Sequence, residues 1–350
     1  MMERVMNWAR AGGFHPPQVI ILSFVVVMAA VALFLKIDVR AIFGDALVRL
    51  AMNGVLVLSL VPMFNAGIGL NFGLPVGIVA GLLGMCLAVN FRMSGLAGFI
   101  SALFFSVPIA VFCGAIYSRI LNRVSGREEI AATFVGFSFV CLMNLFWATA
   151  PFSNLVMLWP IGGHGMRPTI GLQNYFGKAL NSLWSVNVAG VKVPLGLLLF
   201  FGLLGYLVHL FMRTRIGRAL EAVGENETFA ALSGVDVSRV RTLAVILSTV
   251  LGAWGICVYA QSYGFIELYD APLMMAFPAA SALLIGGATG GRTAIAQVIV
   301  GTFLFQTVYV LSAPITNELL IPEAAEILRM IVTNCVILYA LLHRGGVIRA

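Results

Sequence analysis

The sequence predicts an all-α polytopic membrane protein with about ten transmembrane helices. Of its 350 residues, 61% are hydrophobic and 10% are charged, whereas soluble domains carry about 45–50% apolar and about 25% charged residues. The apolar residues fall in long runs, many of them close to the roughly 20 residues that cross the hydrocarbon core of a bilayer. No soluble core could bury this excess, so the whole chain, residues 1–350, is expected to form one transmembrane domain.

The predicted spans follow one another through short connections, apart from one long loop. The first span comes after Arg4 and Arg10, but it is long enough to cross and lacks the small-residue cleavage site of a signal peptide. The sixth begins at Pro194, a residue suited to the first turn of a helix. Whether the eighth crosses the whole bilayer is left open. The expected spans are 18–36, 46–64, 68–90, 96–118, 130–150, 194–212, 240–261, 273–288, 293–313 and 324–342.

Positive charge sets the expected orientation, because Lys and Arg are more frequent in cytoplasmic loops. The favoured topology places both termini and the charged loop 213–241 in the cytoplasm, and the polar and aromatic loop 151–192 outside the cell. The net charge of +7 is then explained by topology, and no nucleic-acid partner is predicted. The expected location is a bacterial-type inner (plasma) membrane, crossed several times.

Loop 213–241 holds five arginines and four acidic residues between two apolar spans. Asn226 is typical of a helix N-cap and Gly234 of a left-handed C-terminal cap, so a short helix is expected between them. Phe229 and Leu232 lie three residues apart, on one face of this helix, and would fit a groove on a partner protein.

Two interrupted segments, 65–75 and 264–278, each follow a full-length span and lead into a Gly-rich one. Breaks at corresponding places are typical of inverted repeats that border a transport path. Glycine also simply allows helices to pack closely, and the two interpretations stay equally open. Polar side chains at membrane depth would contact a solute, or would form interhelical hydrogen bonds of about 0.6 kcal/mol each. They are Asn53, Asn65, Asn71, Asn144, Gln297, Gln306 and Asn334, of which Asn65 and Asn71 flank a break. The candidate path residues are Asn65, Gly69, Asn71, Phe72 and Phe277.

No catalytic, cofactor or metal site is predicted. The glycine clusters 67–73 and 286–292 lack the spacing and the Gly-Lys-Ser/Thr ending of nucleotide-binding loops. The four histidines are scattered, and the five cysteines show no ligand spacing. Carboxylates at membrane depth, which mark proton- or sodium-coupled carriers, are expected in none of the spans. The chain should therefore take its energy from a partner.

The run from Gly217 to Arg239 reads GRALEAVGENETFAALSGVDVSR. It resembles the signature loop of ribose-type ABC importer permeases, which runs approximately G-R-x-x-x-A-x-G-x-N-x-x-A-A-x-x-S-G-I-x-V. The glycine pairs at 286–287 and 290–291 resemble a late segment of the same family. The resemblance implies a type II-importer-like fold over most of the chain. The residues expected to couple the loop to an ATPase are Arg218, Gly224, Asn226, Ala230, Ala231, Ser233 and Gly234, together with Phe229 on the partner-facing side.

The resemblance also implies a division of labour. Two permease chains, identical or different, would form the pore, and cytoplasmic ABC ATPases carrying ATP and Mg²⁺ would dock on the coupling loop. An extracytoplasmic binding protein would deliver a small polar solute, a monosaccharide or a nucleoside. One departure lies at Gly69, where sugar-importing members usually have the Asp of G-I-D-L-S-x-G, and it leaves the solute open. This chain would itself bind no cofactor and catalyse no reaction. The alternative is a stand-alone secondary carrier of a neutral polar solute.

Overall fold

The computed structural model describes residues 16–124, 126–159, 163–188, 191–288 and 293–319, together with 327, 330, 331 and 334–339. Within these residues the fold is mainly helical, as predicted, with two small two-stranded sheets. Six of the described helices are long and apolar enough to cross a membrane. They are α3 (Val39–Leu58), α6 (Gly95–Leu121), α7 (Glu128–Thr149), α9 (Leu195–Arg213), α12 (Val237–Tyr263) and α14 (Ile295–Leu319).

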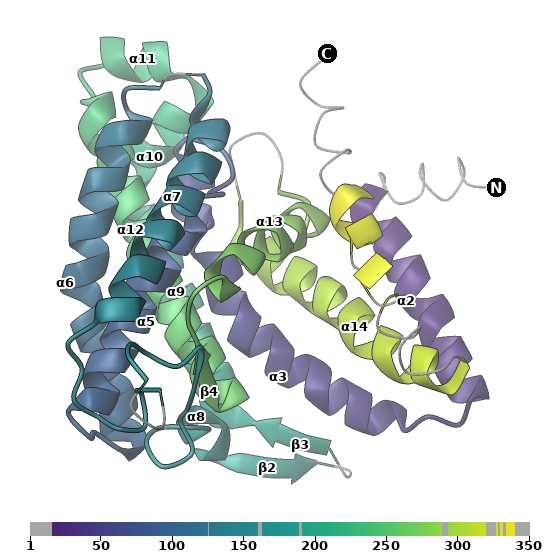
Figure 1. The fold of residues 1–350 in the computed structure, drawn as a ribbon. Helices are drawn as coiled ribbons and strands as arrows, with labels where there is room; N and C mark the ends of the chain where they lie inside the picture. The colour runs from purple at the N-terminus through teal and green to yellow at the C-terminus, as the bar shows by residue number, and fades with distance from the viewer. Residues whose placement is uncertain are drawn as a thin grey trace.

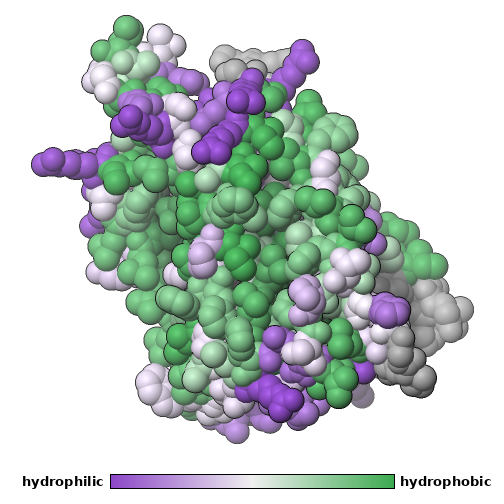
Figure 2. All heavy atoms as spheres, turned by 60° about the vertical axis from the view of Figure 1, so that its left-hand side comes forward, coloured by the Kyte–Doolittle hydropathy of each residue, from purple (hydrophilic) through white to green (hydrophobic). Residues whose placement is uncertain are grey.

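The helices form two groups that meet along α3 (Figure 1). One group contains α5 (Leu74–Asn90), α6, α7 and α12, and the other contains α2 (Pro16–Phe34), α3 and α14. Helix α12 contacts α3 and so joins the groups, and α9 also packs against α3. Two short helices, α10 and α11, lie at one end of the molecule, and the β-strands lie at the other. Figure 2 shows hydrophobic side chains over the middle and hydrophilic ones at both ends, the pattern expected of a protein that spans a bilayer.

The third predicted span is broken, as expected. Helix α4 (Val61–Asn65) ends before α5 begins at Leu74, and Gly67 and Gly69 between them have φ angles of 72° and 99°. This left-handed region is open to glycine and disfavoured for other residues. The eighth predicted span is also broken, into the 3₁₀ helix η1 (Ala271–Met274) and α13 (Ala276–Ile285). With 10 residues, α13 is about 15 Å long, half of the hydrocarbon thickness.

Helix α3 begins seven residues earlier than the second predicted span, at Val39 instead of residue 46. The cause is an N-cap at Asp38, whose carboxylate accepts hydrogen bonds from the backbone N–H groups of Arg40 (3.0 Å) and Ala41 (3.5 Å). The prediction that the spans hold no carboxylate is therefore wrong, because Asp45 lies within α3. Arg49 lies ten residues into the helix, about 15 Å from its start, instead of near the mouth of the span.

Loop 151–192 is more ordered than a connecting loop. Strand β1 (Thr169–Gly171) pairs antiparallel with β4 (Phe265–Glu267), and β2 (Ser185–Val188) pairs with β3 (Val191–Pro194). Helix α8 (Ala179–Ser182) precedes the hairpin. Side chains of the segment are buried against the helix ends, among them Met157, Met166, Ile170, Leu172 and Phe176. The segment therefore caps one end of the helix bundle.

Several predicted features stay open. About half of the tenth predicted span, 324–342, lies outside the described residues. The glycine pair 290–291 lies outside them entirely. The count of about ten helices and the inverted repeat therefore remain predictions.

Candidate functional site: a helical loop and a polar cavity

Loop 213–241 contains two helices where the sequence predicted one. Helix α10 (Arg215–Glu225) begins at Thr214, whose hydroxyl accepts a hydrogen bond from the N–H of Gly217 at 3.2 Å. It buries Gly217, Leu220 and Val223 on one face and leaves its charged residues outside. Its apolar residues recur at a spacing of three, which is typical of a helix. This pattern was overlooked when residues 213–225 were predicted to be loop.

The second helix, α11 (Glu227–Leu232), confirms the predicted caps. The side chain of Asn226 accepts a hydrogen bond from the N–H of Phe229 at 2.9 Å, and Gly234 has a left-handed φ of 85°. Ala230 is buried and anchors the helix, whereas Phe229 is 67% and Leu232 84% exposed. Two large apolar side chains thus project from the polar end of the molecule.

An ion-pair cluster fastens α11 to the helix bundle. Arg241, in the first turns of α12, donates a hydrogen bond to Glu128 at the start of α7 over 2.5 Å. It also lies 3.5 Å from the carboxylate of Glu227 in α11. The side chains of Arg241 and Glu128 are 8% and 13% exposed, so this pair is buried, while Glu227 is 55% exposed. The sequence analysis did not single out Glu128, because its partner is more than a hundred residues away.

The same loop touches the broken third span directly. Gly224 packs backbone to backbone against Asn65 and Gly67, and a Cβ at Gly224 would overlap the carbonyl oxygen of Asn65. Asn65 in turn binds the backbone of Thr293, accepting from its N–H at 2.8 Å. Gly224 and Asn65, predicted as parts of two different sites, are therefore in contact.

Other predicted coupling residues lie on the surface of the loop. Arg218 lines a surface hollow beside Thr293. Ala231, Ser233 and Gly234 are exposed, as expected of residues that face a partner.

Glu129 fills the space that Gly69 leaves. Its carboxylate accepts a hydrogen bond from the N–H of Leu70 at 2.8 Å, and a Cβ at Gly69 would overlap that carboxylate. The Gly69 departure from the sugar-type pattern thus accommodates an acidic side chain from α7. The two glutamates at the start of α7 therefore both bind other elements: Glu128 binds α12, and Glu129 binds the broken segment.

Of the remaining candidate path residues, Asn71 lies in the protein interior, Phe72 is half-buried and Phe277 is 40% exposed. Asn71 is buried and donates to Ser248 on α12 at 2.9 Å, while it accepts from the hydroxyl of Tyr117 at 2.9 Å. Phe72 packs against Phe277, with ring centroids 5.2 Å apart. Asn71 thus forms interhelical hydrogen bonds, which were the predicted alternative to contact with a solute.

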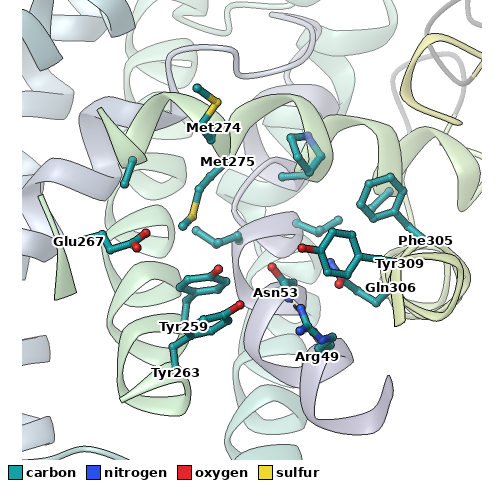
Figure 3. A pocket seen from close by; sticks show the side chains of 16 residues that line it. Arg49, Asn53, Tyr259, Tyr263, Glu267, Met274, Met275, Phe305, Gln306 and Tyr309 are labelled. Carbon is teal, nitrogen blue, oxygen red and sulfur yellow. Dashed lines mark hydrogen bonds between the residues drawn. The ribbon is translucent and has the colours of Figure 1, made fainter. Parts of the chain in front are cut away.

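A polar cavity of about 290 Å³ lies between α3, α12, α13 and α14 (Figure 3). Tyr259 and Tyr263 stack on one side, with ring centroids 5.2 Å apart. The guanidinium of Arg49 lies over the ring of Tyr309 on the other, 4.9 Å from its centroid. The polar lining residues are Arg49, Asn53, Tyr259, Tyr263, Glu267, Gln306 and Tyr309.

This cavity contains none of the five predicted path residues. A sequence signal for it exists, since Asp45, Arg49 and Asn53 are spaced by four and so share one face of α3. Asn53 and Gln306 were among the polar residues expected at membrane depth. Arg49 was missed because the predicted span began at residue 46, which placed this residue at the membrane edge.

The fold and these two sites define a multi-pass membrane permease: apolar spanning helices, a polar cavity between them, and a helical loop that presents apolar side chains at one polar end. Comparison with known families gives the particular class. Residues 42–341 match the family described as the permease component of branched-chain amino acid transport systems. The chain belongs to this family, and it is a permease of an ABC importer.

Other comparisons add little. No curated protein matches the chain. Among solved structures, one described as an inward-facing conformation of a metal-chelate type ABC transporter is similar over 93% of this chain and 97% of its own, with 15% identity and a TM-score of 0.49.

Proposed function

We propose that the chain forms half of the pore of a bacterial importer, and that a cytoplasmic ABC ATPase drives it by binding to α10 and α11. ATP and Mg²⁺ would be held by that ATPase. A second permease chain, identical or different, would complete the pore, and an extracytoplasmic binding protein would deliver the solute at the end capped by residues 151–192. Both termini would be cytoplasmic.

The single observation that carries this proposal is the construction of α11. Its tip exposes Phe229 and Leu232, while its base is held by the Asn226 cap and the Arg241 ion pairs. Isolated apolar side chains on a rigid, polar-rimmed element are typical of a docking surface. Because α10 lies against the broken third span at Gly224, movement of a docked partner would reach the transport domain directly.

The proposed solute is a small polar molecule of the monosaccharide or nucleoside class. Asn53 and Gln306 offer amide groups to hydroxyls, and the stacked Tyr259 and Tyr263 offer aromatic surface to a sugar ring or a base. A cavity of about 290 Å³ is close to the lower end of the roughly 300–1,000 Å³ typical of small-molecule sites. A stand-alone secondary carrier is not favoured by the family match.

Co-purification tests the docking assignment. We expect Phe229→Asp with Leu232→Asp to abolish recovery of the co-expressed ABC ATPase with the tagged full-length chain, because both changes put charge into an apolar contact. Val186→Asp is the matched control, since Val186 is an exposed apolar residue at the opposite end of the molecule. Unchanged ATPase recovery with the α11 variant, with the protein still monodisperse, would contradict the proposal.

A further inference from the structure

Arg49 is a cation at membrane depth with no carboxylate partner in the described part of the chain. The ion pairs found there involve Arg239 and Arg241 only. Arg49 lies midway along α3, where an ionisable side chain is costly and usually marks a pathway for a solute or an ion. Its guanidinium lies over the ring of Tyr309 and lines the cavity, and among the described residues no carboxylate lies within ion-pair distance of it.

Arg49 also connects two hollows. The polar cavity and a neighbouring groove of about 420 Å³ share Arg49 and Tyr309 in their linings. The groove runs along α3 and α14 toward Asp38 and Asn317, at the far end of both helices. A solute moving from the groove into the cavity therefore passes the guanidinium.

The groups around Arg49 suit a hydrogen-bonding anion. Gln306 is 7% exposed and its amide has no hydrogen bond within the described residues. Asn53 uses its N–H₂ on the backbone carbonyl of Arg49, at 3.0 Å. Figure 3 shows Asn53 beside Arg49, with Tyr309 and Gln306 across from Tyr259 and Tyr263.

Two carboxylates lie near this arrangement. Asp45, one turn before Arg49, lines the groove, and Glu267 lies at the opposite side of the cavity on β4. Both are exposed, and neither is within ion-pair distance of Arg49. Neither carboxylate therefore neutralises the guanidinium through a direct ion pair.

We propose that the solute carries an oxyanion, a carboxylate or a phosphate, that binds the guanidinium of Arg49 as it passes. A planar guanidinium pairs with such groups through two parallel hydrogen bonds. Gln306 and the tyrosine hydroxyls then bind the polar remainder of the solute. The proposal rests on the proposed function and narrows its solute class to acidic sugars and sugar phosphates.

Binding of matched solute pairs to the full-length chain in lipid nanodiscs tests this proposal. The pairs are D-galacturonate with D-galactose and D-ribose 5-phosphate with D-ribose. In at least one pair, the oxyanion member should bind more tightly than its partner. Arg49→Gln should weaken that binding about tenfold or more, the effect of losing a charge-assisted hydrogen bond, and Arg49→Lys should weaken it less.

Arg40→Gln is the matched control, because Arg40 is an exposed arginine on the same helix that lies outside the cavity lining. It should leave binding unchanged. Glu267→Gln should leave the binding of galacturonate or ribose 5-phosphate unchanged or make it tighter, because it removes a negative charge from the lining of the same cavity.

The proposal is overturned if no oxyanion member binds better than its neutral partner, or if Arg49→Gln and Arg40→Gln have equal effects. Thermal melting of each variant checks that the fold is intact. A separate measurement tests the proposed function. Solute uptake into liposomes without any ATPase would contradict ATP-driven import, but it would not change the binding results that test the role of Arg49.

Discussion

Removing Arg241 should destabilise the helical loop and the start of α7 together. In Arg241→Met, the carboxylate of Glu128, 13% exposed, loses its cation. Breaking a buried ion pair on one side costs about 3–5 kcal/mol. The contact with Glu227 adds at most about 1 kcal/mol, because that carboxylate is 55% exposed. The expected loss is therefore about 3–5 kcal/mol in the free energy of unfolding.

Reversible unfolding in mixed detergent micelles measures this loss. Arg239→Met is the control, since Arg239 is 86% exposed and, among the described residues, its one ion pair is with Asp236 in the same turn. Its removal should cost less than about 1 kcal/mol. The double variant Arg241→Met with Glu128→Gln should recover most of the stability, because no charge is left buried. The assignment of a stabilising buried ion pair would be refuted if Arg241→Met left the free energy of unfolding unchanged. It would also be refuted if the double variant were no more stable than Arg241→Met alone.

Three further changes test the surroundings of the loop. Gly224→Ala should cost about 1–3 kcal/mol through overlap with the broken segment, whereas Gly202→Ala, which meets no atom within 4 Å, should cost nothing measurable by the same unfolding titration. Asn226→Ala should cost about 1 kcal/mol and speed amide hydrogen exchange in α11, and unchanged exchange would exclude its role as a cap. Tyr117→Phe should cost about 1–3 kcal/mol because the side-chain oxygen of Asn71 loses its donor in the protein interior; a thermal melt identical to that of the unaltered chain would contradict this.

Local chemistry made α11 predictable. An Asn that caps one end and a Gly that ends the other are readable from neighbouring residues, and both caps occur as predicted. The break before α5 was readable for the same reason, since glycine marks left-handed backbone.

What depends on distant residues was missed. The boundary of α3 depends on a cap at Asp38 that extends the helix beyond its apolar run, and the depth of Arg49 follows from that boundary. Glu128 and Glu129 are ordinary helix-start residues in the sequence, and only the packing of α7 brings them to Arg241 and Leu70. The path residues were placed at the break, but the cavity lies farther along α12, at Tyr259 and Tyr263.

Uptake by proteoliposomes tests the central claim most directly. The vesicles would contain this chain, its co-purified ABC ATPase, any second permease chain and the binding protein, with radiolabelled solute outside. ATP-driven import predicts uptake that requires ATP and is abolished by Phe229→Asp with Leu232→Asp. Uptake that proceeds on an ion gradient without the ATPase, or that survives the α11 changes, would contradict it.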